Sequence, residues 1–162
     1  MGYKGARPRQ PEWREVDVAQ VLNAVIDLVK HSAGKGIVFT KRISDKVPPL
    51  LADEEQIAQA VLNLTLNAAQ AMPDGGEIVL AASAKDAGVL IQVRDEGMGV
   101  AAEHMDRIFD PFFTTKENGT GLGLSVVHQI ARQLGGTVSV ERNDGRGMTF
   151  SLYFPQSHGE RA

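Results

Sequence analysis

The sequence predicts a two-layer α/β sandwich, with one mixed, mostly antiparallel sheet of about five strands and about three helices on one face. Three observations lead to this fold class. Helical and extended apolar patterns interleave along the chain. Short turns join most of the extended segments, which favours hairpins and therefore antiparallel pairing. The 162 residues suit one domain and contain no internal repeat.

The helices are predicted from apolar spacing and from the signals at their ends. Asp53 is placed to cap the second helix, with Gln56 three residues later in a capping-box pattern. A pair of glycines at 135–136 closes the last helix. The glycine-bearing segment 96–121 is expected to be a loop that contains a short helix near 101–108. The three main helices are expected at about residues 16–30, 54–72 and 122–134.

The strands are predicted from short apolar runs that end at clusters of proline, glycine, asparagine and aspartate. Residues 1–15 are polar and are expected to form a linker. Residues 16–155 are expected to be the folded domain, and residues 156–162 a disordered tail. The strands are expected at residues 36–43, 50–51, 77–84, 89–95, 137–141 and 148–154.

Composition narrows the class of protein. Apolar residues make up 43% of the chain, enough for a core. The net charge of −3 argues against general nucleic-acid binding, and the absence of cysteine excludes thiol catalysis and thiolate metal sites. No apolar run reaches the ~18 residues of a membrane-spanning helix, and no signal-peptide pattern is present. We therefore expect a cytoplasmic domain without direct membrane contact.

A row of amides runs along the otherwise apolar helix at 54–72. A buried amide without a hydrogen bond costs ~1–3 kcal/mol, and asparagine is a poor interior helix former. Asn63 and Asn67, one turn apart, therefore favour a face that meets a ligand, and their amide oxygens could coordinate a hard cation. Taken alone, the row is more typical of the exposed stripe of an amphipathic helix. Its members are Gln56, Gln59, Asn63, Asn67 and Gln70.

Two glycine-bearing segments follow. Asp95 ends a strand and could accept a proton from a ring amine, while Gly97 and Gly99 let the backbone approach a flat ligand. The glycine run at 119–123 opens the last helix, where free N–H groups bind phosphate. It matches neither the P-loop nor the Rossmann pattern. Each segment alone is weak evidence, but the three signals in this order are much more specific.

Together these segments resemble the catalytic and ATP-binding domain of bacterial sensor histidine kinases, which belongs to the superfamily shared with gyrase, Hsp90 and MutL. The resemblance spans about residues 16–155 and implies the Bergerat-type ATP-binding fold. The Phe-Phe-Thr-Thr-Lys run is most similar to the nitrogen-regulation type. The matched motifs are Asn63-x-x-x-Asn67-Ala68, Asp95-x-Gly97-x-Gly99, Phe109-Asp110-Pro111-Phe112-Phe113, Gly119-Thr120-Gly121-Leu122-Gly123-Leu124 and the closing strand from Gly145 to Phe150.

The resemblance implies roles for the matched residues. Asn67 would ligate a Mg²⁺ ion that bridges the ATP phosphates, with support from Asn63. Asp95 would accept a hydrogen bond from the adenine amino group. Lys116 would contact a phosphate during catalysis, although a solvated lysine is an equal alternative. Phe109 is expected to pack in the core. The other implied nucleotide contacts are Gly97, Gly99, Thr115, Gly119, Thr120, Gly121, Leu122 and Gly123.

Two residues of the amide row bear on the type of reaction. The superfamily's ATPases usually carry a water-activating glutamate where this chain has Asn63, and an amide has no useful basicity at neutral pH. General-base help is worth ~10²–10⁴ in rate, so hydrolysis should be slow and ATP should remain available for transfer. Gln70 stands where many histidine kinases carry a basic residue, so the resemblance does not identify the group that stabilises the γ-phosphate.

The resemblance also implies partners. A phosphoacceptor histidine is usually followed by an acidic residue on a long helix, and none of the four histidines is so placed. We expect the acceptor on a separate dimerisation domain, and a response regulator receiver domain as the next acceptor. An anti-sigma-factor-type serine kinase and a non-catalytic nucleotide-binding module remain open. The Phe-Phe-Thr-Thr-Lys and glycine runs favour the histidine kinase over the former, and the intact motifs argue against the latter.

Overall fold

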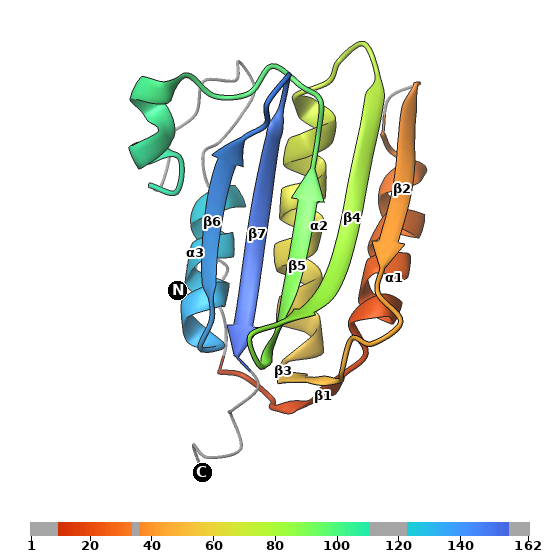
Figure 1. The fold of residues 1–162 in the computed structure, drawn as a ribbon, viewed down its shortest axis with the longest axis vertical. Coiled ribbons are helices and arrows are strands. Elements are labelled where there is room, and N and C mark those ends of the chain that lie inside the picture. The colour runs from red at the N-terminus through yellow and green to blue at the C-terminus, as the bar shows by residue number, and fades with distance from the viewer. Residues whose placement is uncertain (1–9, 34–35, 111–122, 156–162) are drawn as a thin grey trace, which may run out of the picture.

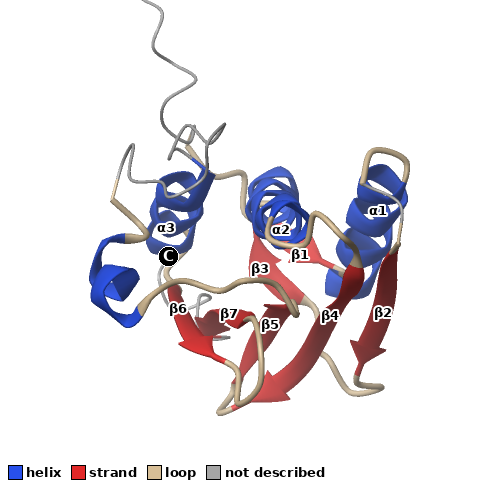
Figure 2. Cartoon of the chain, turned by 90° about the horizontal axis from the view of Figure 1, so that it is seen from above, coloured by secondary structure: helices blue, strands red, loops and turns tan. Residues whose placement is uncertain are grey.

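The molecule has two layers, with the α-helices of the described residues on one face of the main sheet (Figures 1 and 2). The computed structural model describes residues 10–33, 36–110 and 123–155. The helices are α1 (Val18–Lys30), α2 (Glu54–Gln70) and α3 (Gly123–Gln133), and a 3-10 helix, η2 (Ala102–Arg107), precedes α3. The five-stranded sheet has the order β2 (Ile37–Ile43), β4 (Gly76–Lys85), β5 (Gly88–Arg94), β7 (Met148–Pro155) and β6 (Thr137–Arg142). This confirms the predicted fold class.

Strand direction follows from how the strands are connected. β2 reaches β4 through α2 and pairs with it in parallel, whereas the other neighbours pair antiparallel. Every second residue of β7 is buried, which gives the sheet one face toward the helices. The buried set is Met148, Phe150, Leu152 and Phe154.

The hairpin between β4 and β5 turns through two residues with positive φ, Asp86 at 45° and Ala87 at 60°. Positive φ at both positions suits a two-residue hairpin, but it costs a residue such as alanine ~1–2 kcal/mol. The Tyr153 hydroxyl on β7 lies 3.0 Å from the Lys85 carbonyl oxygen and 2.7 Å from that of Asp86. Its single proton can serve either acceptor, so the neighbouring strand holds this turn.

A second, two-stranded sheet lies at one end of the molecule (Figure 1). β1 (Arg14–Val16) pairs antiparallel with β3 (Leu50–Ala52), with Arg14 opposite Ala52. Two residues of β1 fall within the stretch that the sequence suggested was a linker. The folded part therefore begins earlier than expected, because three residues with no periodicity of their own gain partners from a distant segment.

The helix that carries the amide row, α2, lies between α1 and α3 over the sheet (Figure 2). Its predicted apolar row, Ile57, Val61, Leu64 and Ala68, is buried. Within the described residues no helix is both long and apolar enough to cross a membrane.

Asp53 begins α2 and makes hydrogen bonds with both of its carboxylate oxygens. Oδ1 accepts from the Gln56 N–H at 3.1 Å, as the capping pattern predicts, and Oδ2 accepts from the Glu12 N–H at 2.8 Å. The side chain is nearly buried, since the residue is only 2% exposed. One carboxylate therefore joins the segment before β1 to the first turn of α2.

Replacing Asp53 with alanine is expected to lower the free energy of unfolding by about 2 kcal/mol, because a helix cap and a partly buried bond are both lost. Asp17 offers a matched control, because it caps α1 through an exposed contact of 3.3 Å to the Gln20 N–H. Asp17→Ala should cost about 0.5 kcal/mol, at the lower end for caps. Urea denaturation followed by circular dichroism measures both values, and equal losses would contradict the bridging role of Asp53.

Candidate functional site

The amide row of α2 faces the start of α3. Asn63 Nδ2 donates to the Gly123 carbonyl oxygen at 3.2 Å, while Asn63 Oδ1 accepts from Gln59 Nε2 at 2.8 Å. Asn67 lies one turn further along the same face of the helix. Asn63 and Asn67 are both half-buried. The two asparagines are therefore neither in the solid core nor on an open stripe of the surface.

The start of α3 presents open space. A Cβ atom added at Gly123, its first residue, would meet no atom of the described residues within 4 Å. Backbone N–H groups in the first turn of a helix have no partner inside the helix, so this end can accept an anion. Several residues that were predicted to contact the nucleotide or to form the segment before α3 lie outside the described residues: Phe112, Phe113, Thr115, Lys116, Gly119, Thr120, Gly121 and Leu122.

Asp95 follows β5 and is only 2% exposed. Its Oδ1 accepts hydrogen bonds from the Gly97 N–H at 2.8 Å and from the Met148 N–H at 3.3 Å. A carboxylate this deeply buried is costly unless hydrogen bonds compensate for its desolvation. These two backbone donors stabilise the carboxylate and fix its orientation at the end of the strand.

The two positions after Asp95 that carry glycine, 97 and 99, require it for different structural reasons. An added Cβ at Gly97 would lie 2.5 Å from the Ala71 carbonyl oxygen, so glycine is needed for close packing against the end of α2. Gly99 has a φ of +75°, which favours glycine for backbone reasons. The Met98 N–H donates to the same Ala71 carbonyl at 3.3 Å, and the Ala71 N–H donates to the Asn67 carbonyl at 3.1 Å. The segment after Asp95 is thus bonded to the helical turn that begins at Asn67.

The sequence did not reveal the role of the turn between β6 and β7. Gly147 has a φ of +94°, and an added Cβ there would lie 2.0 Å from the Asp95 carbonyl oxygen. Asn143 Nδ2 donates to that same carbonyl at 2.9 Å. The glycines of this turn and its asparagine were visible as turn signals, but nothing in the sequence pairs them with a strand end some fifty residues earlier.

The aromatic and histidine residues of the described part have packing or surface positions. The Phe109 ring lies 6.2 Å from the Phe150 ring, edge to face, and 5.8 Å from the ring of His128. This agrees with the expected core packing of Phe109. His31 is exposed at the end of α1, and His104 lies half-buried in η2. None of these three histidines is followed by an acidic residue.

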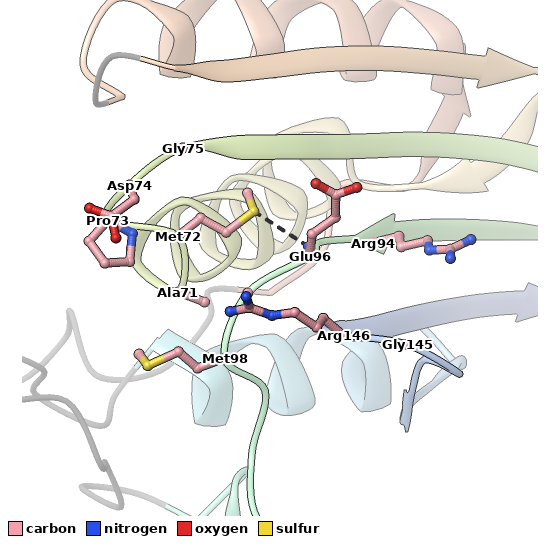
Figure 3. A pocket seen from close by; sticks show the side chains of 11 residues that line it. Ala71, Met72, Pro73, Asp74, Gly75, Arg94, Glu96, Met98, Gly145 and Arg146 are labelled. Carbon is pink, nitrogen blue, oxygen red and sulfur yellow. Dashed lines mark hydrogen bonds between the residues drawn. The ribbon is translucent and has the colours of Figure 1, made fainter.

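A cavity of about 540 Å³ adjoins the segment after Asp95 (Figure 3). It lies where α2 ends and the β6–β7 turn approaches. Gly97 lines it, but neither asparagine of the α2 face does, and nor does Asp95, so the cavity adjoins the candidate site. Its lining residues are Ala71, Met72, Pro73, Asp74, Gly75, Arg94, Glu96, Gly97, Met98, Gly145 and Arg146.

The family follows from the fold, the motifs and a direct match. The model of the histidine kinase-, DNA gyrase B-, and HSP90-like ATPase family matches residues 52–158, which include α2, Asp95 and α3. The chain belongs to this family and is an ATP-binding domain.

Similar proteins place the chain on the histidine kinase branch. The sensor histidine kinase ZraS of Escherichia coli K12 is 43% identical over 150 residues, which is 92% of this chain and 32% of that protein. Sporulation kinase E of Bacillus subtilis is 36% identical over 152 residues, which is 93% of this chain and 21% of that protein. The chain thus spans a third or less of the length of these curated relatives.

Solved structures agree with this placement. The catalytic domain of histidine kinase ThkA superimposes with a TM-score of 0.82 at 30% identity, covering 90% of this chain and 96% of that one. Full-length ShkA in complex with AMPPNP gives a TM-score of 0.83 at 35% identity, covering 93% of this chain and 32% of that one. The chain is therefore the catalytic, ATP-binding domain of a histidine kinase. Its assignment to the nitrogen-regulation type stays a prediction.

Proposed function

We propose that this domain binds ATP together with Mg²⁺ in the cytoplasm and transfers the γ-phosphoryl group to a histidine of a separate dimerisation domain. A response regulator would then receive the group from that histidine. The observation that carries the proposal is one arrangement: a buried, backbone-held carboxylate at Asp95, bonded through Ala71 to the helix that presents Asn63 and Asn67. ThkA, a similar kinase at 27% identity and a TM-score of 0.80, has been solved in complex with the response regulator protein TrrA.

The Asp95 carboxylate is well placed to bind the base of the nucleotide. A carboxylate is an acceptor only, and Gly97 and Met148 hold one of its oxygens through backbone N–H groups. A carboxylate fixed in this way is preorganised to accept a hydrogen bond from the exocyclic amine of adenine. Because the partner is charged, such a bond is worth ~1.5–3 kcal/mol.

The asparagines of α2, Asn63 and Asn67, carry side-chain oxygens that can bind a hard cation next to the phosphates. In the described part of the chain, no group of three or more His, Cys, Asp or Glu side chains could hold a metal ion. Amide oxygens are suitable ligands for hard cations, and Asn63 Oδ1 keeps a second lone pair beyond the one that Gln59 uses. Bound Mg²⁺ would neutralise phosphate charge, with Asn67 as its ligand and Asn63 in support.

The same asparagines favour transfer over hydrolysis. Neither amide can remove a proton from water, and phosphoryl transfer depends mainly on positioning and charge neutralisation. The start of α3 lies across from Asn63 and offers backbone N–H groups to the phosphates. ATP held in this way would persist until an acceptor histidine reaches the γ-phosphate.

The direct test mixes this chain and γ-labelled ATP with the purified dimerisation domain of its own full-length kinase. We expect label on the acceptor domain in an acid-labile, base-stable form, which is the signature of phosphohistidine. The control is the same acceptor domain with its histidine replaced by alanine, which should stay unlabelled. Acid-stable label on serine would instead support the serine kinase, and ATP binding without any transfer would support the non-catalytic module.

A further inference from the structure

We propose that Asn143 is a positioning residue for Asp95 and thereby sets how strongly the domain prefers adenine over purines that lack the 6-amino group. The inference rests on the proposed adenine role of Asp95. Asn143 lies in the turn between β6 and β7, 48 residues from Asp95 along the chain. Its side chain nevertheless reaches the backbone of that aspartate.

Asn143 uses each of its side-chain polar atoms. Nδ2 donates to the Asp95 carbonyl at 2.9 Å and to the Arg146 carbonyl at 3.1 Å. Oδ1 accepts from the Thr149 hydroxyl at 2.6 Å. The Asn143 N–H also donates to the Gly147 carbonyl at 3.0 Å. One amide thus closes the turn on itself and joins it to the end of β5.

This turn also positions the backbone N–H of Met148, the hydrogen-bond donor that orients the Asp95 carboxylate. Residue 148 follows Gly147 directly, and its N–H donates to Asp95 Oδ1, while the Asp95 N–H donates to the Met148 carbonyl at 2.9 Å. The 2.0 Å clash that a Cβ at Gly147 would make with the Asp95 carbonyl shows how close the two backbones are. A shift of the turn would therefore rotate or displace the Asp95 carboxylate.

Only an asparagine makes this set of contacts. An aspartate at 143 is nearly the same size and could still accept from Thr149, but it would place an acceptor oxygen against two carbonyl oxygens. The repulsion would push the turn away from Asp95. The substitution should therefore weaken binding of the nucleotide base. Binding of the phosphates, which is proposed to involve α2 and α3, should stay unchanged.

The test compares the affinities of ATP and purine riboside triphosphate, which lacks the 6-amino group, by calorimetry with Mg²⁺. For the unmodified chain we expect ATP to bind about 10- to 150-fold more tightly, since a hydrogen bond to a charged group is lost. Asn143→Asp should shrink this ratio at least about threefold, mainly by weakening ATP. Asn143→Ser provides the same comparison if the aspartate variant does not fold. Asp144→Ala, at an exposed position in the same turn, is the matched control and should keep the ratio.

The possible results distinguish a failure of the role proposed for Asn143 from a failure of the adenine role proposed for Asp95. If the unmodified chain binds both triphosphates equally, the adenine role of Asp95 fails and Asn143 has no base preference to set. If the unmodified chain prefers ATP but the Asn143 variants keep its ratio, the inference alone is overturned. Equal weakening of both nucleotides in those variants also overturns it, because that is the result of a merely structural role.

Discussion

Replacing Asn67 with alanine is expected to abolish the tightening of ATP binding by Mg²⁺ and to slow phosphoryl transfer roughly 100-fold or more. Asn67 lies half-buried on α2, one turn beyond Asn63 and one turn before Ala71. Its amide oxygen is the proposed protein ligand of the ion that bridges the phosphates. Calorimetry with and without Mg²⁺ measures the first effect, and single-turnover labelling of the acceptor domain measures the second.

A second asparagine makes the control for this experiment. Asn23 is exposed on α1 and accepts a hydrogen bond from Lys41, away from the α2 face. Asn23→Ala should leave both the Mg²⁺ effect and the transfer rate unchanged. The metal assignment is wrong if magnesium tightens ATP as much in the Asn67 variant as in the unmodified chain.

Replacing Asp95 with asparagine is expected to weaken ATP and ADP alike, by about 10- to 150-fold, because the bond from the adenine amine loses its charged partner. The change is nearly isosteric. The remaining amide oxygen can still accept from the Gly97 and Met148 N–H groups, so the strand end should keep its shape. Calorimetry with each nucleotide gives the loss, and the ratio of affinities with and without Mg²⁺ should stay constant.

The neighbouring carboxylate serves as the control. Glu96 is exposed, and its Oε1 accepts from the Glu77 N–H at 3.1 Å, a bond that glutamine can keep. Glu96→Gln should therefore bind nucleotide as the unmodified chain does. Unchanged affinity in Asp95→Asn, or an equal loss in Glu96→Gln, would count against the adenine role.

The two variants change groups that are proposed to bind opposite ends of the nucleotide, so their effects should separate. The Asn67 change should alter the response to magnesium, while the Asp95 change should alter affinity at every magnesium concentration. If Asn67 and Asp95 bind separate ends of the nucleotide, the changes in binding free energy caused by the two substitutions should add. A double variant that departs strongly from additivity would indicate that one of them has disturbed the fold.

The sequence was most informative where a signal is local. The three helices and the hairpins followed from apolar spacing and turn residues, and Asp53 followed from its capping pattern. The asparagines of α2 and the carboxylate of Asp95 became candidate site residues because each places a polar group within or directly after an apolar element. A polar residue in such a place needs a structural or a functional partner.

What the sequence missed depends on contacts between distant segments. β1 exists because three residues pair with β3. A strand at residues 50–51 was predicted, but nothing in the sequence predicts the segment that pairs with it. Asn143 was read as a turn residue and Gly147 as part of the closing-strand motif, and neither reading reveals the contact with the Asp95 backbone. The positive φ of Ala87 could not be predicted from the sequence either, because alanine rarely adopts it and the stabilising contact comes from Tyr153 on another strand.

The bond between Asp95 and the N–H of Met148 joins residues 53 positions apart, so it forms only when β7 has docked beside β5. Closing so long a stretch of chain is entropically costly. The geometry proposed to bind the purine is therefore acquired together with the last hairpin and cannot exist in a chain folded only as far as β5. A nucleotide that binds this geometry alone must, by mass action, stabilise the complete sheet against unfolding.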